Sequence, residues 1–531
     1  MTRSLGEWRE GLAASTVTGS SRGPGASAPC VPGLTVVAHP DVRRVGERVA
    51  LPEIPSGRAV ELSRLVPLFS PPGGGAPEPL ADPRLSRSPL LLGPGPARGS
   101  VLVRRGDSSM ALEVDGRPVQ AEHLCSADDL ERGAVLLLAD RIVLVLHPMP
   151  PAPARETERF GLIGDGAAMA RLRADIRRVA DLEVAVLLRG ETGTGKELVA
   201  RAIHRSSPRR SRPYLAVNMG AIPPALAAAE LFGAARGAFT GADQRRIGYF
   251  SQAHGGTLFL DEIGETPAEV QVLLLRALET GEIQPVGAEA PRRVDVRVLA
   301  ATDADLEAAI EAGRFRAPLL HRLNGYEVRL PALRERREDF GQLFFAFLRQ
   351  ELEAMGEGDR LDDPGPRGAA WMPAPLVVRL AAADWPGNVR QLRNVARQIA
   401  IGNRGAAQAV LPPAVLGSLE RQVDGGSGTR PAPSPLRPAY RRPADVGEEE
   451  LLAALAANRW KLVPTAAQLG ISRTALYTLI DRCAGIRKAA DLDRVEIVEA
   501  MARHGKDLDA VVEELRVSRH GLQLRMTELG L

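Results

Sequence analysis

The chain has 531 residues, of which 25% are charged and 44% hydrophobic, with 53 glycines and 42 prolines. At roughly 150 residues per domain, this length predicts three or four folded units joined by linkers rich in glycine and proline. There is no apolar run of the roughly 18 residues that would cross a membrane, and no secretory leader. Its three cysteines, Cys30, Cys125 and Cys483, lie too far apart for a disulfide framework. We therefore expect a soluble cytoplasmic protein.

The basic residues are almost all arginines. Lysine and arginine together number 68, but only four are lysines, and Lys196 is the only lysine in the first 460 positions. A codon bias toward arginine explains this composition as a whole. A lysine kept among so many arginines nevertheless marks Lys196 as a position where a compact ammonium performs chemistry that a guanidinium does not.

Composition divides the chain into folded stretches and linkers. Residues 1–32 are rich in Ser, Gly, Ala and Pro and predict a disordered lead. Short apolar runs broken by Gly, Pro and Asp predict a small β-sandwich over residues 33–148. Strand-like runs then alternate with helical stretches from 160 to 401, the pattern of an α/β unit with a parallel sheet. The other segments are predicted as two linkers, 149–159 and 402–447, and a helical tail, 448–531.

The tail contains an internal repeat. Shifted by 46 positions, Ile471-Ser472-Arg473 aligns with Val517-Ser518-Arg519. Apolar positions match at the same shift, in the pairs Ala454/Ala500, Leu462/Leu508, Leu469/Leu515 and Leu476/Leu522. Two copies of one helical unit, 448–486 and 487–531, are therefore predicted. In the first copy the expected helices are Glu450–Asn458, Pro464–Leu469 and a third that Ser472 caps and that runs to Cys483.

A phosphate-binding motif lies in the α/β unit. The run Gly190-Glu191-Thr192-Gly193-Thr194-Gly195-Lys196 satisfies G-x-x-x-x-G-K. It follows an apolar strand, Val184–Leu188, and precedes a helical run in which Leu198, Val199, Ala202 and Ile203 share one face. In this context the glycines let backbone N–H groups face phosphates, and Lys196 reaches the β- and γ-phosphate oxygens. Glu197 stands where the general motif has the Ser or Thr that holds Mg²⁺.

Two carboxylates follow a second apolar strand. The run Thr257–Leu260 ends in Asp261 and Glu262, and a third strand, Val296–Ala301, ends next to Thr302. Asp261 is suited to organise Mg²⁺, and Glu262 to orient or polarise an attacking water. Together with the motif upstream, this pattern predicts an ATPase.

Five runs resemble, in order and spacing, the AAA+ domain of bacterial sigma-54 activators, also called enhancer-binding proteins. They are Gly190–His204, Gly237–Ala242 (GAFTGA), Gly255–Glu265, Leu330–Phe340 and Trp385–Leu392. The resemblance covers Phe160 to Ile401, and it implies an AAA+ core with a helical lid at about 335–401. Glu197 also occurs at this position in the family.

The resemblance implies a role for several further residues. Asn218 would hold the catalytic Glu262 back until the partner engages, and Phe239 and Thr240 would contact sigma-54 from a mobile loop. Nucleotide sensing would fall to Thr302 and Arg390. Arg316 and Arg322 match the intersubunit arginine fingers of the family, which complete the site of a neighbouring protomer and imply a ring, usually a hexamer.

Three positions depart from the family pattern. Asp303 replaces the usual Asn after the first sensor, Pro318 replaces an Asp between the fingers, and Gln391 replaces a Glu after Arg390. Because proline lacks an N–H and restricts the residue before it, Pro318 is expected to disturb the two fingers most.

The tail pattern of helix, helix, turn and helix is typical of a helix-turn-helix, and it resembles the Fis-type tail of the same family. The residues expected to face DNA are Arg473, Thr474, Tyr477 and Arg482, with Arg519, His520 and Arg525 in similar places of the second copy. Basic and acidic residues balance at fourteen each from Arg441 to Leu531, whereas DNA binders usually show a basic face. A structural three-helix bundle, with a second copy that serves dimerisation, remains the alternative.

The N-terminal unit resembles a degenerate forkhead-associated (FHA) sandwich, a reader of phosphothreonine. The resemblance rests on Gly46, Ser86-Arg87, Val114-Asp115-Gly116 and the apolar runs between 133 and 147. It implies that Ser86 and Arg87 bind phosphate. Pro89 replaces a His of the family and Asp115 replaces an Asn, so a sandwich without phosphopeptide affinity is the alternative.

These observations predict an ATP-dependent activator that binds upstream DNA and remodels sigma-54 RNA polymerase into the open promoter complex. Its expected cofactors are ATP and Mg²⁺, bound through Lys196 and Asp261. The expected partners are the sigma-54 holoenzyme, double-stranded DNA, a phosphothreonine protein and further copies of the chain. Two alternatives stay open: a DNA-binding regulator not coupled to sigma-54, and a phosphopeptide-binding scaffold with residual ATPase activity.

Overall fold

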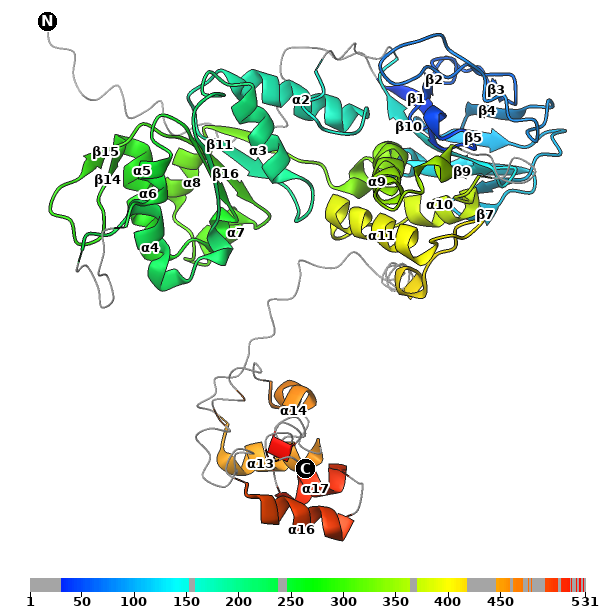
Figure 1. Ribbon diagram of the computed structural model, residues 1–531. Coiled ribbons are helices and arrows are strands. Elements are labelled where there is room, and N and C mark those ends of the chain that lie inside the picture. The colour runs from blue at the N-terminus through cyan, green and yellow to red at the C-terminus, as the bar shows by residue number, and fades with distance from the viewer. Residues whose placement is uncertain are drawn as a thin grey trace, which may run out of the picture. The chain divides into compact units, whose positions relative to one another are not determined.

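Figure 1 shows the computed structural model, in which the chain forms two units divided between Gly426 and Ser427. In the first unit the structure describes residues 30–151, 158–236, 246–362 and 370–417. In the second it describes 446–458, 462–470, 492–504 and 508–515, with the single positions 476, 479, 517, 522, 525, 526 and 529. None of the helices described is both long and apolar enough to span a bilayer.

Two antiparallel sheets form an N-terminal sandwich. One has six strands in the order β2-β1-β10-β9-β6-β7, and the other has four in the order β3-β4-β5-β8. The strands are β1 (Val31–Ala38), β2 (Arg48–Ala50), β3 (Val60–Leu62), β4 (Leu90–Pro94), β5 (Val101–Arg104), β6 (Leu112–Val114), β7 (Arg117–Pro118), β8 (Glu122–Cys125), β9 (Ala134–Leu138) and β10 (Ile142–Met149). A short helix, α1 (Ala127–Arg132), begins after a capping box formed by Ser126 and Asp129.

The strands β1, β9 and β10 are buried on both faces. Alternate residues such as Leu34, Leu136 and Leu144 point into the core between the two sheets. The residues between them, including Val37 and Val145, belong to a second core that contains helices of the ATPase lid described below. Because neither face is left for polar side chains, these strands are nearly continuous apolar runs.

The α/β unit contains a five-stranded parallel sheet. Its strands are β11 (Val186–Arg189), β12 (Tyr214–Asn218), β13 (Thr257–Asp261), β16 (Arg297–Thr302) and β17 (Tyr326–Arg329). Their order is β12-β13-β16-β11-β17, so β11 lies between β16 and β17. The predicted parallel sheet is confirmed, although β12 and β17 were not predicted as strands. A separate ribbon pairs β14 (Glu282–Ile283) with β15 (Arg292–Arg293).

Helices cover both faces of this sheet. They are α2 (Ala167–Ala180), α3 (Lys196–Arg205), α4 (Pro224–Phe232), α5 (Tyr249–Gln252), α6 (Ala268–Thr280), α7 (Leu306–Glu311) and α8 (Ala317–Leu323). Helices α2 and α3 share a core with Leu188 and Leu299, whereas α4, α6 and α8 share another with Leu258 and Leu260. The face predicted for α3 is wrong at Leu198, which is 58% exposed while Val199 is 1% exposed.

The lid consists of α9 (Phe340–Ala354), α10 (Ala374–Ala381) and α11 (Asn388–Gly402). Residues 413–417 are also helical, and Ala409, Leu411 and Val415 are buried in the same core. The predicted linker at 402–447 therefore starts too early, because residues 402–417 complete the lid. Short 3-10 helices lie at Val42–Arg44, Met219–Ala221, Ile263–Glu265, Leu333–Glu335, Arg337–Asp339 and Gly358–Leu361.

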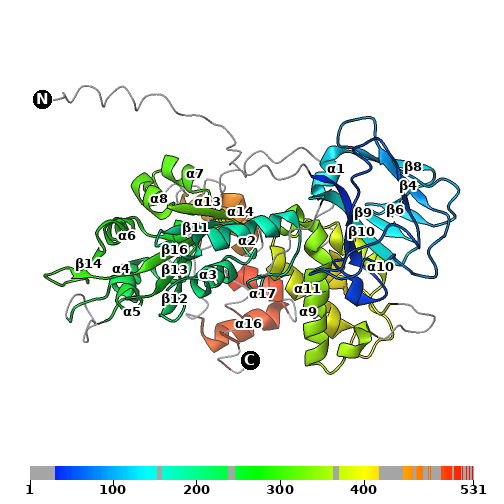
Figure 2. The same cartoon turned by 90° about the horizontal axis from the view of Figure 1, so that it is seen from above.

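The sandwich and the lid are packed directly together. Helices α9 and α10 lie against β1, β9 and β10, as both views show (Figures 1 and 2). A Cβ atom added at Gly341 of α9 would lie 2.3 Å from the carbonyl oxygen of Val37 in β1. At this point only a glycine lets the helix approach the strand so closely.

The second unit contains α13 (Glu448–Ala457), α14 (Leu462–Leu469), α16 (Arg494–His504) and α17 (Leu508–Leu515). Shifting α13 and α14 by the 46 positions of the sequence repeat places them on α16 and α17. The paired residues Ala454 and Ala500, and likewise Leu476 and Leu522, are buried in one common core. The described helices therefore follow the predicted repeat, and the two copies share a core.

Candidate functional site: a nucleotide cavity between sheet and lid

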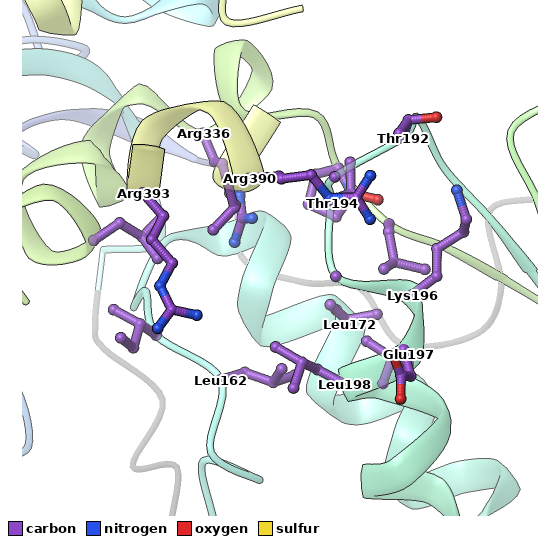
Figure 3. Close-up of a pocket in the computed structure, with 18 of the residues that line it drawn as sticks. Leu162, Leu172, Thr192, Thr194, Lys196, Glu197, Leu198, Arg336, Arg390 and Arg393 are labelled. Carbon is purple, nitrogen blue, oxygen red and sulfur yellow. The ribbon is translucent and has the colours of Figure 1, made fainter. Parts of the chain in front are cut away.

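A cavity of about 630 Å³ lies between the carboxyl end of the parallel sheet and the lid. Figure 3 shows Arg390 and Arg393 reaching it from the lid, with Leu162, Leu172 and Leu198 on the other side. Its lining changes character along its length. The motif Thr192–Lys196 and the carboxylates of Asp261, Glu262 and Asp303 line one end, and apolar side chains such as Leu162 line the other together with Arg393.

The phosphate-binding loop joins β11 to α3, the arrangement that the motif requires. Gly193 and Gly195 have φ angles of +81° and +104°, which side chains disfavour. A Cβ at Gly193 would also lie 2.3 Å from the carbonyl oxygen of Gly387 in the lid. The loop thus directs backbone N–H groups and the N-terminus of α3 at the cavity, a geometry suited to phosphate.

Lys196 opens α3 and is 9% exposed. Its ammonium donates hydrogen bonds to the carbonyl oxygens of Gly190, at 2.7 Å, and Glu191, at 3.3 Å. Burial lowers the pKa of Lys196, and the carboxylates of Asp303, Asp261 and Glu262 oppose that shift. The ammonium, next to the loop and the carboxylates, is therefore placed for a polyphosphate.

The acidic pair ends β13. Glu262 has a φ of +54°, an uncommon conformation for a residue with a side chain, and its N–H donates to Asp261 Oδ1 at 3.0 Å. Burial is the main cause that raises the pKa of Asp261, and Lys196 lowers it in part. The strain at Glu262 fits a group whose orientation matters more than local stability.

Gly220 is a site residue that the sequence reasoning missed. A Cβ there would lie 2.4 Å from Glu262 Oε2 and 3.3 Å from Asn218 Oδ1. The Glu262 carboxylate and the Asn218 side chain therefore both lie over the bare backbone of Gly220. Asn218 Oδ1 also accepts a hydrogen bond from the Ala221 N–H at 3.2 Å.

The cavity fits a nucleotide with its metal ion. Its polar end offers backbone donors and Lys196 to phosphates, and its apolar end offers a place for a base. In the described part of the chain, no three His, Cys, Asp or Glu side chains gather as a metal site. Mg²⁺ usually shares the oxygens of a bound phosphate and needs only one or two carboxylates, such as Asp261.

The two predicted sensors lie differently. Arg390, on α11, lines the cavity as expected. Thr302 is 1% exposed, does not line the cavity, and its hydroxyl accepts a hydrogen bond from the Ala304 N–H at 3.0 Å. Its neighbour Asp303 does line the cavity and accepts a hydrogen bond from Thr192 Oγ1 at 2.5 Å. The departure from the family pattern at 303 thus brings a third carboxylate to the phosphate end.

Three side chains join the phosphate-binding loop to the lid, and we call them the P-loop clasp: Glu191, Arg334 and Asn388. The Glu191 carboxylate accepts hydrogen bonds from Arg334 at 2.8 and 2.5 Å and from Asn388 Nδ2 at 3.0 Å. Asn388 also donates to the Thr192 carbonyl at 3.1 Å and accepts from the Leu333 N–H at 2.8 Å. Arg334 is the main cause that lowers the pKa of Glu191.

Glu191 was predicted to bind nucleotide, but its side chain is bound to the lid instead, and neither Gly190 nor Glu191 lines the cavity. Asn388 lies in the run Trp385–Leu392, but no role was predicted for it. Its φ of +50° follows a Trp-Pro-Gly sequence, and that turn was the signal in the sequence that pointed to it.

The two predicted arginine fingers lie outside the cavity of their own chain. Arg316 caps the N-terminus of α8 and Arg322 lies in its last turn; both are exposed, and neither lines the cavity. The Arg316 N–H donates to Gln271 Oε1 at 2.9 Å, and the Gln271 amide donates to the Arg314 carbonyl at 2.9 Å. Gln271, fully buried on α6, therefore fixes the finger segment.

Pro318 does not break this arrangement, contrary to expectation. It lies in the first turn of α8, where a helix has no intrahelical partner for its N–H groups. Its fixed φ suits this position, and the helix continues to Leu323.

Several predicted residues lie outside the described residues or away from the cavity. Phe239, Thr240, Arg473, Thr474, Tyr477 and Arg482 fall outside the described residues. Arg525 is described, and it donates to the Leu492 carbonyl at 3.1 Å within the tail. In the sandwich, Arg87 is exposed, and Ser86 Oγ accepts a hydrogen bond from the Ser88 N–H at 3.0 Å.

Known proteins resemble this chain over its ATPase region. A family model described as the sigma-54 interaction domain matches residues 162–329, and one described as the AAA+ ATPase lid domain matches 334–423. Together the two matches point to ATPase activity.

The DNA-binding transcriptional regulator NtrC of Escherichia coli (strain K12) is 48% identical over 250 residues, 47% of this chain and 51% of NtrC. The transcriptional regulatory protein ZraR of the same strain is 39% identical over 330 residues, 62% of this chain and 70% of ZraR. The crystal structure of NtrX from Brucella abortus in complex with ATP matches with a TM-score of 0.42 and 31% identity, covering 61% of this chain and 69% of NtrX. The chain thus spans about half the length of NtrC.

Proposed function

The chain belongs to the family of transcriptional regulators that carry a sigma-54 interaction domain with an AAA+ lid, and from this premise we propose that it is an ATP-dependent transcription activator. It binds DNA upstream of promoters, assembles into a ring and remodels sigma-54 RNA polymerase into the open complex. The observation that carries the proposal is the cavity in which Lys196, Asp261, Glu262 and Arg390 converge. Such a protein acts in the cytoplasm.

The residues of the cavity divide the work of ATP hydrolysis. Lys196 and the backbone of the P-loop bind the phosphates, and Asp261 would hold Mg²⁺, which would supply charge neutralisation when bound. Glu262 orients and polarises the attacking water, and its carboxylate lies over Gly220, where any side chain would collide with it. Arg390 contacts the nucleotide from the lid.

The test of this proposal is the loss of ATP hydrolysis in Lys196 variants. Both Lys196→Ala and Lys196→Arg should abolish ATPase activity and promoter activation, because a guanidinium does not fit between the Gly190 carbonyl and the phosphates. Arg205→Ala is the matched control, since Arg205 is exposed at the other end of the same helix and does not line the cavity. Normal activation by Lys196→Ala would overturn the ATP-driven model.

The sequence Gly237–Ala242 supports coupling to sigma-54 through Phe239 and Thr240. A phenylalanine between small residues offers a large apolar contact that a loop of Gly and Ala can present. Thr240→Ala should leave ATP hydrolysis intact and abolish transcription from a sigma-54 promoter. Undiminished transcription would favour a DNA-binding regulator not coupled to sigma-54.

Arg316 and Arg322 would act on the neighbouring protomer of a ring, usually a hexamer in this family. Their exposure and their distance from their own cavity support a role in trans. Arg316→Ala and Lys196→Ala should each be inactive, but their mixture should regain ATP hydrolysis wherever an intact finger meets an intact P-loop. A mixture that stays inactive would count against shared sites.

The tail would bind DNA through Arg473, Thr474, Tyr477 and Arg482. The two helices before this segment, α13 and α14, and the turn at Gly470, with φ of +63°, support a helix-turn-helix. Footprinting on DNA upstream of the chain's own operon, with Arg473→Ala as the variant, tests it. Retained protection by that variant would favour a structural bundle.

The sandwich would bind a phosphothreonine protein through Ser86 and Arg87. The exposure of Arg87 supports access for a phosphate. A phosphothreonine peptide library should bind the wild type, and Arg87→Ala should lose this binding, whereas peptides without phosphate should bind neither. Absence of binding by the wild type would leave the sandwich with a purely structural role.

A further inference from the structure

A short loop forms the wall of the nucleotide cavity opposite the phosphates. Gly161, Leu162 and Ile163 line the cavity, and Gly166 is the N-cap residue of helix α2. The residue between them, Asp165, is held from several directions. Its position fixes where the loop meets the apolar end of the cavity, the end that we assign to the base of a nucleotide.

Three different elements hold the polar groups of Asp165. Its N–H donates to Asp339 Oδ1 at 2.8 Å, and its carboxylate accepts from Gln342 Nε2 of α9 at 2.9 Å. Its carbonyl oxygen accepts from Arg48 Nη1 at 2.5 Å. Asp339 and Gln342 belong to the lid region, but Arg48 belongs to strand β2 of the sandwich.

The sandwich fixes Arg48 firmly. Its backbone exchanges hydrogen bonds with Ser70, at 3.0 and 2.9 Å, and it pairs with Thr35 of β1 on the other side. Strand β1 in turn touches α9 at Gly341. The guanidinium therefore reaches Asp165 from a part of the molecule that is itself packed against the lid.

The surroundings of Arg48 favour a persistent contact. Glu338 is half-buried and feels the charge of Arg48, Asp339 is buried and bonds Asp165, and burial raises the pKa of each carboxyl to about 7. The positive charges of Arg336 and Arg48 counteract that shift at Glu338. A charged donor to a carbonyl oxygen at such a half-buried position makes one of the stronger hydrogen bonds in proteins.

We propose that Arg48 is a positioning residue for nucleotide binding, which ties the loop 161–166 to the sandwich and so sets the base-side wall of the cavity. The inference rests on the proposed function of the cavity. It means that nucleotide affinity depends on a residue outside the ATPase domain, and that the sandwich is a working part of the nucleotide site.

The experiment compares two ligands in the full-length chain: a fluorescent ATP analogue and inorganic tripolyphosphate as its competitor. Arg48→Met keeps the apolar stem of the side chain but removes its donors, and Arg48→Lys restores one donor. Arg104→Met is the matched control, because Arg104 lies on the other sheet and pairs with exposed Glu122 at 3.5 Å. Melting temperatures of all variants are measured without nucleotide.

Arg48→Met should weaken binding of the ATP analogue about tenfold, the loss of one charged hydrogen bond. Its affinity for tripolyphosphate should stay that of the wild type, because tripolyphosphate does not reach the loop 161–166. Arg48→Lys should recover part of the affinity, and Arg104→Met should match the wild type.

Two results would overturn the inference. Equal ATP affinity of Arg48→Met and wild type would show that the contact does not act on the cavity. Weaker binding of both ligands, together with a lower melting temperature, would show a merely structural role. Failure of the proposed function looks different, since the wild type itself would then bind neither ligand, with Lys196→Ala indistinguishable from it.

Discussion

The catalytic end of the P-loop, which Lys196 and Glu262 flank, and its lid end, which the P-loop clasp holds, are stabilised very differently. At one end, the Lys196 ammonium contacts two carbonyl oxygens, and Glu262 adopts a strained backbone with its carboxylate over Gly220. At the other end, Glu191 accepts three hydrogen bonds, and Asn388 makes three within the P-loop clasp and its surroundings. The groups that act in the reaction are bonded to the backbone or strained, whereas the groups that fix geometry are saturated with side-chain hydrogen bonds.

Backbone strain and hydrogen-bonded stability are therefore found in different parts of the site. A residue held in an unfavourable conformation persists only where the surrounding structure determines it. On the lid side, the P-loop clasp supplies this surrounding structure, because Asn388 is fully buried and is hydrogen-bonded to both Glu191 and Leu333. Variants at the two ends should therefore fail in different ways, through turnover at one end and through stability and affinity at the other.

The largest effect is expected for Glu262→Gln. Replacing the carboxylate by an amide removes the group that polarises water, so turnover should fall by at least about a hundredfold. Nucleotide affinity and melting temperature should stay close to wild type, because Glu262 contributes little to stability in its strained conformation. Glu265→Gln, an exposed position in the next turn, is the control. A large drop in the melting temperature of Glu262→Gln would contradict the expectation that Glu262 contributes little to stability.

Asn388→Ala should act through stability and affinity. Loss of this buried side chain leaves the Leu333 N–H and the Thr192 carbonyl without their partner, at a cost of about 2 kcal/mol in the free energy of unfolding. The KM for ATP should rise about tenfold while kcat falls less, because the loop loses its position and not its chemistry. Urea unfolding and steady-state kinetics measure both, with exposed Asn324→Ala as control. Loss of kcat alone would contradict the assignment.

Glu191→Gln should reveal a dependence on pH. The pKa of Glu191 is lowered in the folded chain, mainly by Arg334, so the charged carboxylate stabilises the fold above the ordinary glutamate pKa. That contribution is lost as the pH falls through the lowered value. Wild type should therefore be the more stable protein at neutral pH, and its advantage over Glu191→Gln should disappear in acid. An advantage that persists in acid would exclude the ion pair as its source.

Pro318→Ala should have the smallest effect. In the first turn of α8 the proline forfeits no hydrogen bond, so the substitution changes mainly the entropy of the unfolded chain, by at most about 1 kcal/mol. ATP hydrolysis by the assembled protein should be unchanged. A marked loss of hydrolysis would mean that Pro318 orients Arg316 or Arg322 after all.

Local sequence patterns predicted the residues that carry the chemistry of the site better than the residues that hold them in place. The P-loop, Asp261 and Glu262 are each encoded within a few residues, by a strand followed by a turn. The P-loop clasp joins residues 197 positions apart, so no local pattern reports it. The same holds for Leu198, which was predicted to share a helix face with Val199 but is exposed and lines the cavity.

The folds of the flanking units follow a similar division. The continuous apolar runs at 134–138 and 142–146 predicted strands, but not that their outer faces pack on the lid. The short strand β2, which carries Arg48, has no periodic signal in three residues. In the tail, the repeat predicted the spacing of the helices because each copy encodes its own apolar pattern.

The contact between Gly341 and Val37 has a consequence for engineering. Regulators are often redesigned by joining the sensory module of one protein to the motor of another. In an ATPase domain taken from another protein, any side chain at the position of Gly341 would collide with the backbone of β1. That backbone cannot move aside without displacing the sheet. A chimaera that keeps both modules functional has to transfer the sandwich and the ATPase as one piece, or carry glycine at this position.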